Sequence, residues 1–149
     1  MEAMVLTVDA CLQHIMALQG ALGASLIDYP SGSTLGATGR VPGVESGDTD
    51  AARMVYATMK MASFATVGHP SGVEEIVIIA GNGYHLLHPV IDGPHARLVL
   101  YVWLDRVTGN LAVTRRCVNG IAAQFAADPA GCPQRLGRVS IKESLYHLG

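Results

Sequence analysis

The stretch Arg97-Leu98-Val99-Leu100-Tyr101-Val102-Trp103-Leu104 decides the fold of this chain. Its apolar side chains occupy both odd and even positions, so a β-strand over these residues would be apolar on both faces. A strand that is buried on both faces needs one layer of structure above it and another below it. The sequence therefore predicts a layered protein in which helices cover a sheet.

Four further strands precede this one, and turn residues join them in pairs. Asn82-Gly83 lies between two apolar runs and predicts a hairpin, because both residues tolerate positive φ. Pro30-Ser31-Gly32-Ser33 predicts an earlier turn of the same kind. Sequential hairpins imply an antiparallel sheet. The strands are expected at Ala24–Tyr29, Thr34–Thr38, Val73–Ala80, Tyr84–Val90 and Arg97–Leu104.

Apolar residues at helical spacing predict helices over Val8–Leu18, Asp48–Val67 and Asn110–Ala127. Asn110 can cap the last helix, and Gly20 stands where a glycine commonly follows a helix end. The predicted order is α-β-β-α-β-β-β-α, an α+β domain over residues 1–130. Residues 131–149 form a C-terminal tail, which is either a flexible extension or contains a short helix at Ile141–Leu148.

Composition excludes several classes of function. The chain has 149 residues, 50% of them hydrophobic and 15% charged, which suits one folded domain. A net charge of −2 leaves no basic field for nucleic acid or anionic lipid, and no apolar run is long enough to span a bilayer. Three cysteines without a C-x-x-C pair favour neither a disulfide framework nor a zinc site, and indicate a reducing, cytoplasmic location.

The second predicted helix is apolar nearly all the way round. Its only charged residues after Asp50 are Arg53 and Lys60. A helix of this kind is buried on more than one side. Two partners would supply the second side: another subunit of a twofold dimer, or the C-terminal tail of the same chain. The dimer is the favoured alternative.

Motifs for catalysis or cofactor binding are missing from the sequence. The glycine-rich segment Gly39–Gly47 lacks the lysine of a phosphate-binding loop. His85 and His88 stand three apart on a predicted strand, so they should point to opposite faces and not share a metal. Cys117 is expected to be a buried structural cysteine, and the carboxylates at strand ends, Asp28 and Asp105, to stabilise turns. We therefore expect no enzyme activity, no cofactor and no metal.

Three segments together resemble a known family. They are Leu18–Asp28 with Ser31-Gly32 and Gly39, then Val73–Ile79 with Tyr84–Val90, and finally Leu104-Asp105-Arg106 with Asn110–Arg115. In this order, over residues 6–127, they resemble the roadblock/dynein-light-chain family. The resemblance implies a profilin-like three-layer α/β/α fold with a five-stranded antiparallel sheet. It also implies homodimers in which the Val73–Ala80 strands pair and the second helices lie side by side.

In bacteria, some proteins of that family are partners or activators of small Ras-like GTPases, and this chain's arginine-rich composition also favours a bacterial source. The resemblance thus implies a non-enzymatic homodimeric scaffold or regulator that binds a small GTPase. The loop Gly39–Gly47 departs from the family's charged loop, which leaves the partner's identity open. The alternatives are a small-molecule sensor of the PAS or GAF type, which needs a pocket between sheet and helix, and a general interaction module.

Helical phase assigns residues to two surfaces under the GTPase hypothesis. The predicted partner-binding residues are Arg53, Tyr56, Lys60 and Met61. The dimer-interface residues predicted on the helix are Met54, Val55, Thr58, Met59 and Ala62. Ile76 and Ile78 are added from the Val73–Ala80 strand, whose pairing the resemblance implies.

Overall fold

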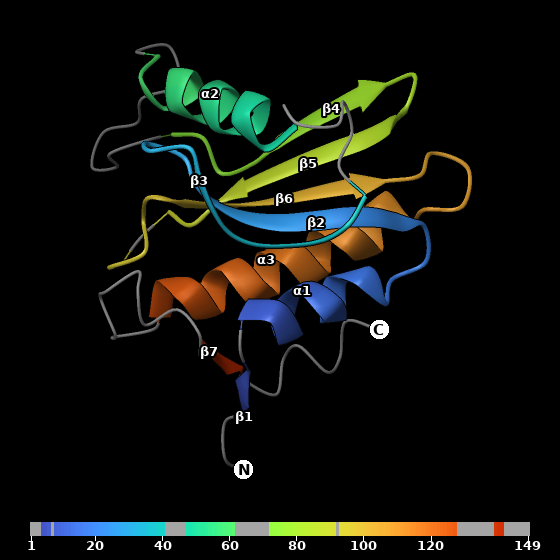
Figure 1. Cartoon of the computed structure of the whole chain (residues 1–149), viewed down its shortest axis with the longest axis horizontal. Helices are drawn as coiled ribbons and strands as arrows, with labels where there is room; N and C mark the ends of the chain where they lie inside the picture. The colour runs from blue at the N-terminus through green and yellow to red at the C-terminus, as the bar shows by residue number, and fades with distance from the viewer. Residues whose placement is uncertain are drawn as a thin grey trace.

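A computed structural model describes residues 4–6, 8–40, 47–61, 72–91, 93–127 and 139–141. At its centre is a five-stranded antiparallel sheet with the strand order β3-β2-β6-β5-β4 (Figure 1). The strands are β2 (Ala21–Asp28), β3 (Ser33–Gly39), β4 (Ile76–Ala80), β5 (Gly83–Pro89) and β6 (Leu98–Leu104). The apolar run that opened the sequence analysis is β6, the middle strand of the sheet, and its residues Leu98 to Val102 are all buried. The predicted antiparallel sheet is confirmed.

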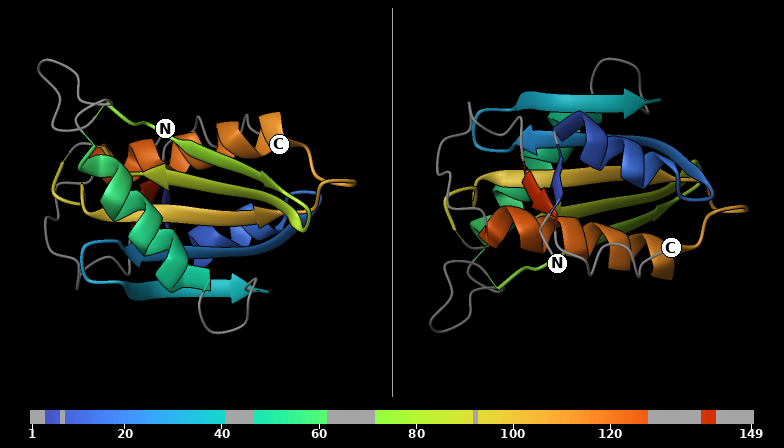
Figure 2. Two further views of the ribbon diagram at one scale, coloured as in Figure 1. Left: turned by 90° about the horizontal axis from the view of Figure 1, so that it is seen from above. Right: turned by 90° about the horizontal axis from the view of Figure 1, so that it is seen from below.

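Helices cover both faces of the sheet, as the apolar β6 requires. The helices α1 (Val8–Met16) and α3 (Leu111–Ala127) lie on one face, and α2 (Gly47–Met59) crosses the other (Figures 1 and 2). The larger core, between the sheet and α1 and α3, contains Leu12, Leu26, Leu100 and Phe125, all less than 2% exposed. A smaller core lies beneath α2. The predicted order α-β-β-α-β-β-β-α and the three layers are confirmed.

Several predicted boundaries are wrong. The second helix ends at Met59, because Lys60 and Met61 continue as a turn in which each amide bonds to the carbonyl three residues earlier. Residues 62–67 of that prediction lie outside the described residues. The turn between β4 and β5 consists of Gly81 and Asn82, since Ala80 pairs with Gly83, so Gly83 begins β5 and is not a turn residue.

A two-stranded ribbon joins the two ends of the described chain. Its strands are β1 (Met4–Leu6) and β7 (Val139–Ile141), which pair antiparallel. The sequence analysis predicted neither strand. Ile141 lies in a strand, so the predicted tail helix does not begin there, and residues 142–149 lie outside the described residues.

Polar residues predicted to stabilise local structure do so. The Asn110 Oδ1 atom accepts the Val113 amide at 3.1 Å, which is the expected cap of α3. Asp28 accepts two bonds from the Arg97 guanidinium, at 2.7 and 3.3 Å, and a third from the Ser31 amide. Asp105 accepts bonds from the Val107 and Thr108 amides and the Thr108 hydroxyl, and these bonds hold the pKa of its carboxyl below the usual range.

The two described cysteines, Cys11 and Cys117, are free thiols buried in the larger core. Burial raises the pKa of each thiol from 9.0 to about 11, and the nearby Cys117 adds to the rise at Cys11. The expectation of a buried structural Cys117 is confirmed, and Cys132 lies outside the described residues.

Gly20 should tolerate no side chain. It has a φ of +84°, and a Cβ atom there would lie 2.4 Å from the Gly109 Cα atom. We expect Gly20→Ala to lower the free energy of unfolding by about 3 kcal/mol, combining backbone strain with overpacking. Gly32→Ala, at φ +80° in open space, should cost only about 1 kcal/mol. Urea denaturation measures both, and equal losses would contradict the role of the Gly109 contact.

The buried thiols should make the fold sensitive to alkali. Because folding raises both thiol pKa values, their contribution to stability is complete below about pH 9 and is lost as pH rises toward about 11. Urea denaturation between pH 8 and 10.5 should therefore show a decline in the free energy of unfolding that is shallower in Cys11→Ala and Cys117→Ala. An unchanged slope in both variants would contradict this assignment.

Candidate protein-interaction face

The helix α2 packs on the sheet through small residues. Ala51, Ala52 and Val55 are buried, with Val55 completely inaccessible. Their contacts lie on the central strands and comprise Ile27, Leu87, Val99 and Tyr101. This side of α2 is therefore buried by contacts within a single chain.

The outer side of α2 leaves large apolar side chains exposed. Met54 and Tyr56 are each 41% exposed, and Met61, just after the helix, is 49% exposed. The Lys60 Nζ atom lies over the Tyr56 ring, 4.1 Å from its centroid, so these two side chains form a cation–π pair. The predicted two-sided helix is thus present, and its second side is open among the described residues.

The strand β4 is an edge of the sheet on the same side of the molecule. All five of its residues, Ile76 to Ala80, are apolar, and Ile79 is 64% exposed. The strand carries none of the charges or prolines with which proteins usually protect an exposed edge. Ile76 and Ile78 face the core beneath α2, while Val77 packs against the core beneath α3.

A hollow of about 1000 Å³ lies between α2 and β4. Its floor is the segment that leads into β4, which is held by an ion pair between Arg115 on α3 and Glu75. The lining residues are Met54, Ala57, Thr58, Met61, Gly72, Val73, Glu74, Glu75, Ile76, Val77 and Arg115. We call this hollow, together with the exposed side of α2 and the β4 edge, the α2–β4 face.

The predicted dimer-interface residues differ in whether they reach the surface of the single chain. Met54 and Thr58 line the hollow, and Ile76 and Ile78 belong to the adjoining edge strand. Val55 was assigned wrongly, because its side chain is 0% exposed beneath α2 and has no surface to offer a second subunit. Met59 is partly buried against the core beneath α2. Ala62 lies outside the described residues.

The predicted partner-binding residues do not form one group. Arg53, Tyr56 and Lys60 are exposed and recur at helical spacing on the side of α2 away from the hollow. Met61 instead lines the hollow beside Met54 and Thr58. The sequence-based assignment omitted Ala57 and the exposed Ile79. Ile79 could have been identified from the sequence, because it lies in an uncharged, β-branched strand that would be exposed at a sheet edge.

The two neighbouring histidines of β5 lie on opposite faces, as predicted. His85 is on the α2 side, where its Nε2–H donates to Asn82 Oδ1 at 2.8 Å and its Nδ1 accepts from the Tyr101 hydroxyl at 2.7 Å. Its ring stacks with those of Tyr101 and Trp103, and burial lowers the pKa of His85. His88 lies on the α3 side and is only 6% exposed.

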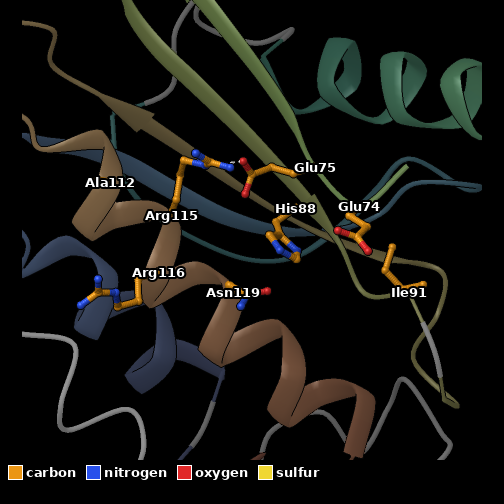
Figure 3. Close-up of a pocket in the computed structure, with 8 residues that line it drawn as sticks. All are labelled: Glu74, Glu75, His88, Ile91, Ala112, Arg115, Arg116 and Asn119. Atoms are coloured by element: carbon orange, nitrogen blue, oxygen red, sulfur yellow. Dashed lines mark hydrogen bonds and ion pairs between the residues drawn. The ribbon is translucent and has the colours of Figure 1, made fainter. Parts of the chain in front are cut away.

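A second, smaller hollow of about 590 Å³ lies between β5 and α3 (Figure 3). It provides the pocket between sheet and helix that the sensor alternative requires. Its lining residues are Glu74, Glu75, His88, Ile91, Ala112, Arg115, Arg116 and Asn119. Within the described ranges, no group of three or more His, Cys, Asp or Glu side chains is placed to hold a metal, and no helix has the length and apolarity to cross a bilayer.

Comparison with known proteins supports the fold. The chain matches no family model and no curated protein. Among solved structures, it is similar to a crystal structure of a Roadblock/LC7 domain from Streptomyces avermitilis, with a TM-score of 0.58 and 15% sequence identity. The match covers 78% of this chain and 92% of that domain. The chain therefore has the roadblock/LC7 fold, and the resemblance seen in the sequence is confirmed at the level of fold.

Proposed function

We propose that this chain is a non-enzymatic, homodimeric interaction module that binds a small Ras-like GTPase. The α2–β4 face carries the proposal, because it joins exposed methionines to an unprotected edge strand. Folded monomers seldom leave such a combination uncovered. The roadblock/LC7 fold supports a role in protein interaction rather than catalysis.

The geometry of the α2–β4 face supports a dimer. Two copies of β4 can pair antiparallel about a twofold axis, which satisfies the unpaired backbone groups of both edges. The same axis brings the Met54 and Met61 sides of two α2 helices together above the joined sheet. Burying apolar area of this kind contributes roughly 25 cal/mol for each Å² removed from water.

The GTPase would contact the side of α2 that remains exposed in such a dimer. Arg53, Tyr56 and Lys60 present two cations and an aromatic ring there. Arginine and tyrosine are frequent in the energetic centres of interfaces, and cations suit an acidic partner surface. The buried free thiols Cys11 and Cys117 support a reducing location, for which we propose the cytoplasm.

Charged substitutions on the α2–β4 face should dissociate the dimer. We expect Met54→Glu and Ile79→Lys each to give the mass of one chain in light scattering, where the wild type gives the mass of two. Both side chains are exposed in one chain, so folding should survive. Val107→Glu is the matched control, since Val107 is 90% exposed on the turn after β6. A monomeric wild type would contradict the dimer.

The partner is tested with nucleotide-loaded GTPases. We would measure binding of purified Ras-like GTPases from the source cell, loaded with a GTP analogue or with GDP, to the immobilised dimer. We expect a preference of at least about tenfold for one nucleotide state, and a loss of about tenfold in affinity for Lys60→Glu, as one interface charge contributes roughly 1–2 kcal/mol.

Arg116→Glu is the control for Lys60→Glu, because it reverses an exposed charge on α3, which lies on the opposite face of the sheet from α2 (Figure 1). Binding that both variants weaken equally would indicate nonspecific charge attraction. An intact dimer that binds no GTPase in either nucleotide state would contradict the GTPase assignment and leave the dimer itself standing.

A further inference from the structure

The hollow between β5 and α3 is lined by a mostly buried histidine that the proposed function does not use. His88 projects from β5 toward α3 and is only 6% exposed (Figure 3). Its Nδ1 atom lies 3.1 Å from the carbonyl oxygen of Pro89. Because a carbonyl oxygen only accepts, Nδ1 carries a proton, and in the neutral form of the ring Nε2 therefore carries a lone pair.

The Nε2 atom of His88 has no hydrogen-bond partner in the part of the chain that the structure describes. The atom is not among the buried polar atoms that lack a partner, so it is accessible from the hollow although most of the side chain is covered. The hollow beside it supplies the room for a partner from outside the chain, and an acceptor there calls for a ligand that donates a hydrogen bond.

The charges around His88 favour a cationic donor. Glu75 is neutralised by Arg115, whereas Glu74 forms no ion pair with any described residue. In Figure 3, Glu74 lies beside Ile91 near the His88 ring, and Asn119 faces the ring from α3. Arg116 points away from both His88 and Glu74 (Figure 3). The inner end of the hollow therefore combines a carboxylate, two neutral acceptors and an apolar wall.

We infer that this hollow binds a guanidinium or ammonium group on an aliphatic stem, with His88 Nε2, Glu74 and Asn119 accepting its N–H groups. Ile91 contacts the stem. A volume of about 590 Å³ lies in the range of small-ligand sites. The same chemistry occurs in an arginine or lysine side chain of a polypeptide and in a free small amine. The site stands on the opposite face of the sheet from α2 and does not depend on the GTPase proposal.

The test is a titration of the full-length protein followed by NMR, with two probes. Nα-acetyl-arginine methylamide represents a side chain of a polypeptide, and agmatine represents a free amine. We expect both to shift the Nε2 resonance of His88 and the side-chain amide of Asn119, while Nδ1 stays protonated. Tighter binding of the capped arginine assigns the site to a polypeptide, and tighter binding of agmatine assigns it to a small amine.

Glu74→Gln should weaken binding of the preferred probe about tenfold, as expected for losing a hydrogen bond to a charged group. Glu74 is exposed, so this variant should fold normally. Asp50→Asn, which removes an equal exposed charge on α2, should leave binding unchanged. Affinity that Glu74→Gln does not alter would overturn the inference. Shifts at His88 caused by acetate or phosphate, with none from either cation, would also overturn it.

Discussion

The structure depends on the burial of β6 on both faces. Leu98, Leu100 and Val102 face the core beneath α1 and α3, and Val99 and Tyr101 face the core beneath α2. Such a strand must lie in the interior of a sheet with a layer on each side. The two layers are unequal among the described elements, because α1 and α3 cover one face and α2 covers the other (Figure 2). Within the part of the chain that the structure describes, the sheet is therefore less completely covered on the α2 side.

The incomplete cover explains why the apolar surface is concentrated at one place. The α2 helix contacts the sheet through alanines and Val55, so its larger side chains, Met54 and Tyr56, are left on the outside. At the other edge of the sheet, β3 is short of apolar residues and mostly exposed, and it is flanked by α1. The β4 edge has neither protection. The chain thus has one edge suited to solvent and one suited to another strand.

The sequence predicted those features that depend on local pattern. The two-sided apolar run of β6, the cap at Asn110 and the opposed histidines of β5 each follow from spacing or from one side chain's chemistry. The prediction of which side chains face outward failed where the sequence pattern fitted several orientations of a helix equally well. An apolar stripe runs around all of α2, so helical phase could not show that Val55 faces the sheet and Met61 the hollow. The pairing of β1 with β7 joins residues far apart in sequence and has no local signal.

The two hollows share a wall, which ties the candidate sites together physically. Glu74, Glu75 and Arg115 line both of them, and the Arg115–Glu75 ion pair holds the segment between. This pair is half exposed on its arginine side, and a pair of that kind contributes at most about 1 kcal/mol. The ion pair alone therefore contributes little to fixing this wall. Under both proposals, a ligand that moved this segment would alter the surface that a second subunit would meet at β4, and by linkage the second subunit would change the ligand's affinity by the same factor.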